Sequence, residues 1–177
     1  MLPEEAKPPM EVKDLYNVLL DTRNLEINLF WQRSNYFLVL NTGIAFGLFN
    51  NIKDGTFVVS IFTFMGLLAS LLWFWVCLGS KFWQTRWEKR LFDFEKEHMP
   101  DLDFFGASHE RIRKDVKDGL AFNELNEPSW TQRFVYKRVL YKPSVSYSMI
   151  RLSLLFVSGW VAFIGWVAFI AIRELYT

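Results

Sequence analysis

The distribution of charged residues divides this chain into long apolar stretches and charge-rich segments. Residues 34–52, 55–80 and 152–172 contain no Asp, Glu, Lys or Arg, and these stretches are 19, 26 and 21 residues long. A helix rises about 1.5 Å per residue, so about 20 apolar residues cross a hydrocarbon core of about 30 Å. A helix at the surface of a soluble protein keeps one polar face. The pattern therefore predicts three membrane-spanning helices.

The segment between the first two predicted spans is short and rich in turn-forming residues. It reads Asn50-Asn-Ile-Lys-Asp-Gly55. Asn and Gly accept left-handed backbone angles, and Asp-Gly favours a tight turn. The first two spans are therefore expected to form a helical hairpin over residues 34–80.

The charge-rich segments are also predicted to be helical. Residues 11–33 contain no Gly or Pro, so this helix should continue into the first span, and the second span has no breaker before Pro100. Ser108 is expected to cap a helix that runs to Leu120. The predicted fold class is thus all-α, with three transmembrane spans and long helices extending into a small cytosolic helical bundle. The predicted segments are a disordered tail (1–10), a cytosolic helix (11–33), the hairpin (34–80), a cytosolic helical segment (81–151), the third span (152–172) and an outer tail (173–177).

Residues 130–141 carry two conflicting patterns. Ser129-Trp-Thr-Gln132 fits a capping box, which favours a helix. The segment from Phe134 to Tyr141 is rich in β-branched and aromatic residues, which favours a strand. A single strand needs a partner and the chain offers no second one. A helix is therefore predicted here, with a strand as the alternative.

The third predicted span contains the hexapeptide Gly-Trp-Val-Ala-Phe-Ile twice, at 159–164 and at 165–170. Six residues turn a helix by 600°, so equivalent positions in the two copies point about 120° apart. The copies cannot build one face. We interpret the duplication as apolar low complexity.

The positions of Lys and Arg predict the orientation of the spans. Eleven of these residues flank the spans on one side, and only Lys53 and Arg173 lie on the other. Cytoplasmic loops carry the excess of positive charge. The N-terminus and residues 81–151 are therefore expected in the cytosol and the C-terminus outside. The predicted anchors at the cytosolic interface are Trp31, Arg33, Trp83 and Trp87.

Each predicted span contains a pair of small residues four positions apart. Helices associate in lipid where small side chains let the backbones approach closely. Whether these pairs act within one chain or between chains is left open by the pattern. The predicted packing positions are Gly43 with Gly47, Gly66 with Ser70, and Ser158 with Ala162.

Two adjacent polar residues, Asn41 and Thr42, lie deep in the first span. An amide buried in a membrane must find a hydrogen-bonding partner or water. One interpretation is an interhelical hydrogen bond, and the other is a position that lines a cavity or pore. The spans contain no acidic, basic or His side chain, so proton-coupled transport is not expected.

Signatures of enzymes and metal sites are weak. No GxSxG, Walker-type or HExxH motif is present. His98, Asp101, Asp103, His109 and Glu110 are close in sequence but lack a ligand spacing. Cys77 lies among apolar residues and is expected to be inert. The net charge of +1 offers no case for nucleic acid. We expect no enzymatic activity, metal or cofactor.

A basic rim follows the second span and precedes the third. Such cations can hold anionic lipid head groups, although orientation alone also accounts for them. The candidate lipid-binding residues are Lys81, Arg86, Lys89, Arg90, Lys137, Arg138 and Lys142.

Residues 23–41 read Arg23-Asn-Leu-Glu-Ile-Asn-Leu-Phe-Trp-Gln-Arg-Ser-Asn-Tyr-Phe-Leu-Val-Leu-Asn41. This stretch resembles the opening of the RipA-like family of small bacterial inner-membrane proteins. The resemblance implies a protein of the bacterial cytoplasmic membrane that forms a homo-oligomer, with an octamer as the candidate size, and has no known enzymatic activity. The hairpin plan alone is also similar to the two-span effector modules of bacterial defence systems, which are proposed to form pores.

These observations favour one function and leave two alternatives. The favoured function is a non-enzymatic inner-membrane protein that self-associates and presents cytosolic helices to a protein partner as a scaffold or regulatory surface. The first alternative is an oligomeric pore lined by the first span, with Asn41, Thr42 and Gly43 along the conduit. The second is a subunit of a membrane enzyme complex. The pattern does not identify the cytosolic partner.

Overall fold

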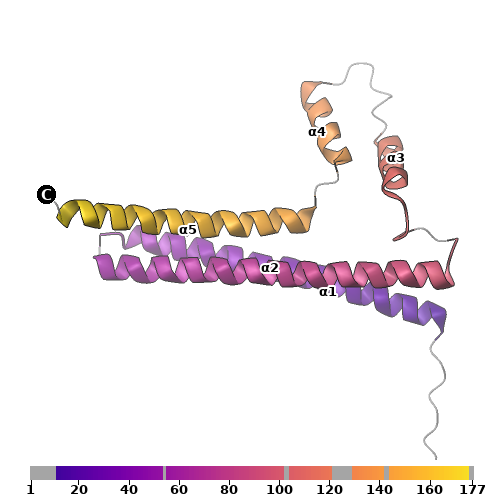
Figure 1. Cartoon of the computed structure of the whole chain (residues 1–177), viewed down its shortest axis with the longest axis horizontal. Coiled ribbons are helices and arrows are strands. Elements are labelled where there is room, and N and C mark those ends of the chain that lie inside the picture. The colour runs from indigo at the N-terminus through magenta and orange to yellow at the C-terminus, as the bar shows by residue number, and fades with distance from the viewer. Residues whose placement is uncertain (1–10, 54, 102–103, 121–128, 142–143, 176–177) are drawn as a thin grey trace, which may run out of the picture. The chain divides into compact units, whose positions relative to one another are not determined.

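The computed structural model describes residues 11–53, 55–101, 104–120, 129–141 and 144–175. Within these ranges all regular elements are α-helices, and no strand is present. The helices are α1 (Val12–Asn50), α2 (Thr56–His98), α3 (His109–Gly119), α4 (Trp130–Leu140) and α5 (Val145–Leu175) (Figure 1). The predicted all-α class is confirmed. The predicted tail at 1–10, Asp103, Lys142 and the last two residues lie outside the described residues.

The helices begin and end where the local sequence chemistry predicts. α1 runs without a break from Val12 to Asn50, and α2 ends at His98, just before Pro100. Gly55, with a φ of 106°, takes the left-handed backbone angle that the turn between them requires. The Ser108 hydroxyl accepts a hydrogen bond from the Arg111 amide at 3.2 Å and so caps α3.

Residues 130–140 form a helix, so the strand alternative for this segment is wrong. The Ser129 hydroxyl accepts a hydrogen bond from the Gln132 amide at 3.3 Å. In return, the Gln132 side chain accepts one from the Ser129 amide at 2.8 Å. This reciprocal capping box satisfies two backbone donors at the start of α4. The cap therefore prevails over the β propensity of the residues that follow it.

The helix that contains the third predicted span is longer than its apolar stretch. α5 starts at Val145 rather than at residue 152, because the Ser144 hydroxyl accepts a hydrogen bond from the Tyr147 amide at 3.5 Å. The predicted third span began at residue 152 because Arg151 is the last charged residue before the apolar stretch. In the structure Arg151 is helical and its side chain is exposed, so a charge at this position does not interrupt α5.

The chain divides into two compact units, and α1 and α2 contribute to both. The apolar unit comprises Asn28–Phe82 and Pro143–Thr177. The polar unit comprises Met1–Ile27 and Trp83–Lys142, and it contains α3 and α4.

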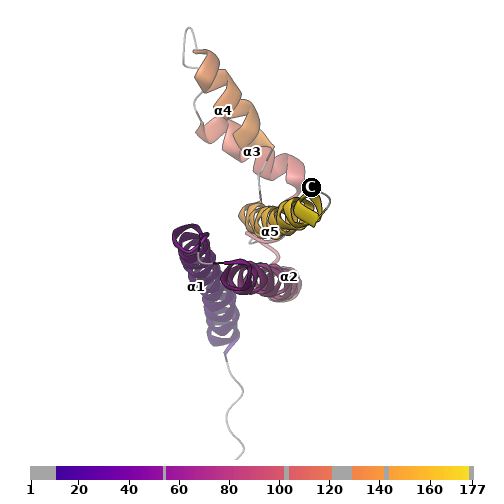
Figure 2. The ribbon, with the colours of Figure 1, turned by 90° about the vertical axis from the view of Figure 1, so that its left-hand side faces the viewer.

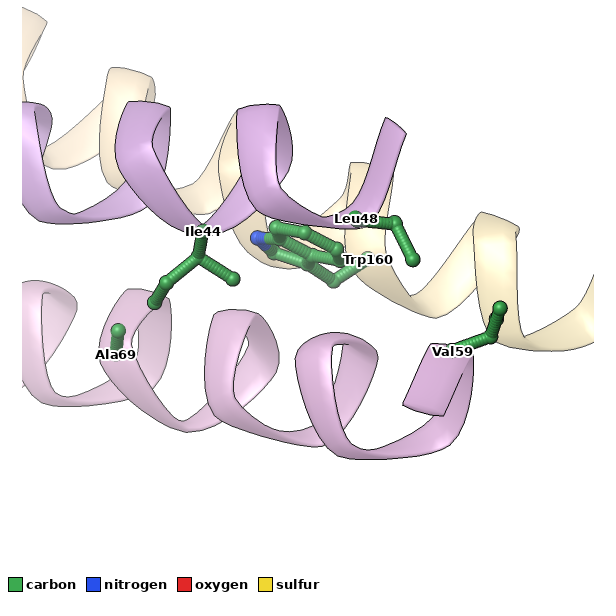
Figure 3. Packing of buried hydrophobic residues seen from close by; sticks show 5 residues of the cluster. All are labelled: Ile44, Leu48, Val59, Ala69 and Trp160. Atoms are coloured by element: carbon green, nitrogen blue, oxygen red, sulfur yellow. The ribbon is translucent and has the colours of Figure 1, made fainter. Parts of the chain in front are cut away.

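The apolar unit packs α1, α2 and α5 around two clusters of side chains. The first cluster contains Ile44, Leu48, Val59, Ala69 and Trp160. Figure 3 shows the Trp160 indole, carried by α5, lying between α1 and α2. In the end-on view of Figure 2, α1 and α2 lie side by side in this unit, with α5 next to them. The second cluster contains Phe30, Trp73, Cys77 and Ile150.

The apolar unit lacks the polar outer surface of a soluble protein and holds polar side chains in its interior beside the two apolar clusters; we call this arrangement inverted polarity. Its interior holds Ser34, Asn41, Thr63, Ser70, Ser80 and Ser153, each at most 5% exposed. Its outer surface carries large apolar side chains such as Val39 (72% exposed), Phe46 (68%) and Phe57 (78%). Water would penalise that surface, whereas lipid tails would not. The inversion therefore indicates a membrane environment.

Two helices among the described residues are long and apolar enough to cross a membrane, Thr56–His98 and Val145–Arg173. Only 33% of the apolar window of the first and 6% of that of the second are buried, unlike the core helix of a soluble protein. α1 does not meet the same criterion, because Ser34, Asn35 and Asn41 lower the mean hydropathy of its apolar half. Two of the three predicted spans, those in α2 and α5, thus meet the criterion of length and composition, and the first predicted span, in α1, does not.

Candidate functional site

The three helices of the apolar unit meet at a polar node, which we define as Asn41 of α1, Ser70 of α2 and Trp160 of α5. The Ser70 hydroxyl lies 2.6 Å from Asn41 Oδ1, to which it donates a hydrogen bond. Trp160 Nε1 donates to the same oxygen at 3.3 Å. The Asn41 amide nitrogen donates to the Phe37 carbonyl at 2.9 Å. Asn41 and Ser70 are 0% exposed, so the amide is satisfied entirely within the chain.

Gly66 makes room for Trp160 in this arrangement. A Cβ atom at Gly66 would overlap the six-membered ring and the fusion bond of the Trp160 indole. The Gly66 carbonyl also lies 2.8 Å from the Ser70 hydroxyl, so the single hydroxyl proton is shared between this oxygen and Asn41. One turn of α2 thus provides both the cavity for the indole and one polar partner of the node.

The predicted packing positions separate into inward and outward groups. Gly47 faces α2, since a Cβ there would lie 2.6 Å from Phe62 Cε1. Gly43 has no atom within 4 Å of such a Cβ and is exposed. Thr42, Ser158 and Ala162 are also exposed. The two hydroxyls donate to carbonyls of their own helices, at Leu38 and Leu154.

The two copies of the hexapeptide have different environments. Trp160, from the first copy, is 7% exposed, whereas Trp166, from the second copy, is 53% exposed. The rotation of about 120° between equivalent positions explains this difference. The sequence does not reveal that Trp160 is the buried indole, because nothing local distinguishes the two copies.

The predicted interface anchors and basic residues do not gather at one site; their local surroundings differ. Arg33 Nη1 donates to the Ser80 hydroxyl at 3.4 Å, which joins α1 to α2. Trp31 and Trp83 are exposed, and Trp87 is half-buried. Arg86 lies over the Trp83 ring at 5.1 Å. Two of the candidate lipid-binding cations lie over aromatic rings: Lys81 is 5.8 Å from the Tyr147 ring, and Arg138 is 5.2 Å from the Phe134 ring. Lys89 forms an ion pair with Asp93. Arg90 and Lys137 are exposed.

The acidic and His residues near Pro100 do not converge in the described part of the chain, where no group of three or more His, Cys, Asp or Glu could hold a metal ion. His98 stacks on Phe94, with ring centroids 4.5 Å apart. This contact is typical of a packed aromatic pair.

The polar unit contains a buried carboxylate that no sequence motif predicts. Glu95 of α2 is 2% exposed. Its Oε1 accepts a hydrogen bond from the Tyr16 hydroxyl of α1 at 2.9 Å, and its Oε2 accepts one from the Phe105 amide at 2.9 Å. The Tyr16 ring also stacks on Phe94, at 5.9 Å between centroids. The Glu95 carboxylate therefore binds both the start of α1, through Tyr16, and the segment after α2, through Phe105. No local pattern could reveal this, because Tyr16 lies 79 residues before Glu95.

Arg23 lies close to the same segment. Its guanidinium carbon is 5.6 Å from the centre of the Phe105 ring, and its Nη2 is 3.8 Å from Glu88 Oε1. Burial, the hydrogen bond to Glu95 and the negative charge of Glu95 all raise the pKa of Tyr16. The phenol therefore remains a neutral donor up to a higher pH than an exposed tyrosine would.

A helical unit of inverted polarity, with two helices long and apolar enough to cross a membrane, and a polar helical unit are typical of an integral membrane protein of the all-α class. A family model, the octameric membrane protein family (8xMP), matches residues 13–170. The chain belongs to this family of oligomeric membrane proteins. No curated protein and no solved structure matches it. This match confirms the expectation of an oligomeric membrane protein. It does not identify the chain as a member of the RipA-like family.

Proposed function

We propose that this chain is a non-enzymatic subunit of a homo-octamer in a bacterial inner membrane, whose polar unit presents helices to a cytosolic protein partner as a scaffold. The observation that carries the proposal is the inverted polarity of the apolar unit, taken together with membership of an octameric family. The unit holds Asn41 and Ser70 in hydrogen bonds within its interior and offers apolar surface outward. That surface suits lipid and neighbouring subunits, not chemistry.

The proposal includes α1 as a third span. Ile44 and Leu48 of α1 pack against Val59 and Ala69, which lie in the most apolar part of α2. If α2 crosses the membrane at these residues, the packed part of α1 lies at the same depth. Its polar Ser34 and Asn41 face inward, and Val39 and Phe46 face outward. Packing against α2 therefore compensates for the lower hydropathy of α1.

We expect the N-terminus and Asp101 in the cytosol and the C-terminus outside, because the Lys and Arg excess lies on that side. Alkaline phosphatase, which is active only outside the cytosol, should give activity when fused after Thr177 and none when fused after Asp101. A cytosol-active reporter at the same two positions provides the reciprocal control. Phosphatase activity at Asp101 with none at Thr177 would reverse the proposed orientation.

The pore alternative is favoured by one observation, the exposure of Thr42 and Gly43 on the outer surface of α1. Copies of α1 could place these residues around a common axis. Against a conduit lined by Asn41 stands its burial, since the amide faces Ser70 and Trp160 inside one subunit. The buried position of Asn41 supports the scaffold.

Conductance in planar bilayers separates these two functions. We expect no channel activity from the unmodified protein. Asn41→Leu should destabilise the subunit by about 0.5–2 kcal/mol, because Trp160 Nε1 loses its acceptor, and should leave the bilayer silent. Thr42→Leu, at the exposed neighbouring position, provides the matched control for stability. Reproducible single-channel steps that either substitution abolishes would replace the scaffold with the pore.

Assembly is tested by native mass measurement of the detergent-solubilised protein together with imaging of the particle. Eight copies and a closed axis are the expected result. Gly43 is the small residue of α1 that is open to a neighbour, so Gly43→Leu should lower the particle mass while subunit helicity is retained. A monomeric wild-type particle would contradict the proposal.

A further inference from the structure

One face of α4 concentrates aromatic rings and positive charges. The exposed rings are Trp130 (79% exposed), Phe134 (50%) and Tyr141 (89%) at the C-cap. At 3.6 residues per turn, these positions and those of three exposed cations fall within an arc of about 140°. The cations are Arg133, Lys137 and Arg138. We call these six residues the aromatic–cationic face.

The rings and cations of this face are arranged together. The Trp130 and Phe134 rings stack with centroids 6.0 Å apart, and the Arg138 guanidinium lies 5.2 Å from the Phe134 ring. α3 and α4 pack against each other within the polar unit. The half-buried residues of α4 are Tyr136 and Leu140, which lie outside the arc. Within the described residues, the packing of α4 thus leaves the aromatic–cationic face exposed.

The positive charge of α4 favours a negatively charged binding partner. The helix contains no Asp or Glu, so the three cations have no compensating charge on their own element. Exposed Trp and Tyr are the residues enriched where membrane meets water, since their rings suit the acyl boundary and their polar atoms the head groups. Cations beside such rings add electrostatic attraction to anionic lipid head groups.

Chain connectivity limits how far the end of α4 can lie from the start of α5. Residues 141–144 separate Leu140 from Val145, where α5 begins. A fully extended chain spans at most about 3.5 Å per residue, so the end of α4 lies within about 18 Å of the start of α5. α5 is one of the two membrane-spanning candidates. We propose that α4 lies along the membrane surface, with its aromatic–cationic face bound to anionic phospholipid head groups.

The inference requires α5 to enter a bilayer and is independent of octamer size and of the scaffold role. Lipid-borne quenching tests it on the full-length protein in nanodiscs made of phosphatidylcholine alone or with phosphatidylglycerol. A fluorophore is placed, in a Cys77→Ala background, at Phe134→Cys within the face or at Val139→Cys on the opposite side of α4. With a spin-labelled lipid as the quencher, we expect strong quenching at 134 and weak quenching at 139 in anionic discs. Discs of phosphatidylcholine alone should show little at either position.

Charge reversal provides the second arm. Each basic residue near an anionic surface contributes about fivefold to the membrane-bound equilibrium. Changing Arg133, Lys137 and Arg138 together to Glu should therefore reduce the quenched fraction at 134 at least fivefold. The matched control changes three exposed cations of α3, Arg113, Lys114 and Lys117, to Glu. It should alter the quenched fraction at 134 less than twofold. Circular dichroism checks that helicity is retained in both.

Three outcomes would overturn the inference. They are equal quenching at 134 and 139, quenching that does not depend on phosphatidylglycerol, and an equal loss from the α3 control. No lipid quenching at 134 combined with capture of an acidic protein or of nucleic acid on the same face would assign the face to a macromolecule instead.

Discussion

Gly66→Leu should disrupt the apolar unit more than any other glycine substitution in it. Even a Cβ at this position overlaps the Trp160 ring, and a leucine adds three further carbons. Displacing the indole withdraws Nε1 from Asn41 and empties the centre of the first cluster. Overpacking alone costs about 1–3 kcal/mol, and the loss of a buried hydrogen-bond donor adds about 1–3 kcal/mol. We expect a large loss of folded protein, measured by thermal unfolding in detergent and by expression.

Gly79→Leu is the matched control, since Gly79 lies on the same helix and a Cβ added there would meet no atom within 4 Å. It should leave the melting temperature within a few degrees of wild type. Gly66→Leu combined with Trp160→Ala should recover part of the lost stability, because the smaller side chain removes the overlap. Equal stability of Gly66→Leu and wild type would show that Trp160 does not occupy this site.

Glu95→Ala should release the start of α1 and the segment after α2 in the polar unit. The substitution removes the acceptor of both the Tyr16 hydroxyl and the Phe105 amide, and a hydrogen bond to a charged group contributes about 1.5–3 kcal/mol. We expect faster hydrogen exchange at the Phe105 amide and faster proteolysis between Met99 and Ser108. Glu88→Ala is the control, because Glu88 makes only a 3.8 Å ion pair that is part-exposed. Unchanged exchange at Phe105 would contradict the role of Glu95.

Glu95→Gln removes the charge and keeps one of the two hydrogen bonds, because the amide oxygen can still accept from Tyr16, whereas the amide nitrogen cannot accept from the Phe105 amide. Removing the negative charge should lower the pKa of Tyr16 towards the usual value of about 10. In the wild type the folded-state pKa lies above the unfolded one. The stability that comes from this hydrogen bond is therefore fully present below about pH 10 and is lost as pH rises above it. Ultraviolet absorbance of tyrosinate, with Tyr16→Phe as the reference, measures the shift.

Local patterns were sufficient for most of the secondary structure, although they placed the start of α5 seven residues late. The absence of Gly and Pro before the first span predicted one continuous α1, and Pro100 marked the end of α2. Capping chemistry located α3 at Ser108 and resolved residues 130–140 in favour of a helix. The contacts that create these features lie within one helical turn. A local sequence is therefore enough to determine them.

Tertiary structure determined which side chains are buried and what they contact. Three charge-free stretches look equivalent in the sequence, yet only the tertiary structure shows that Asn41 of the first is buried against Ser70 and Trp160. Gly43 and Gly47 form one motif, but one faces outward and the other faces Phe62. Two identical hexapeptides yield one buried and one exposed indole, and Glu95 reaches Tyr16 across 79 residues. Sequence determined which elements form, because propensity, capping and charge act over a few residues. Which face of each element is buried, and against what, depends on helix packing between residues distant in the chain.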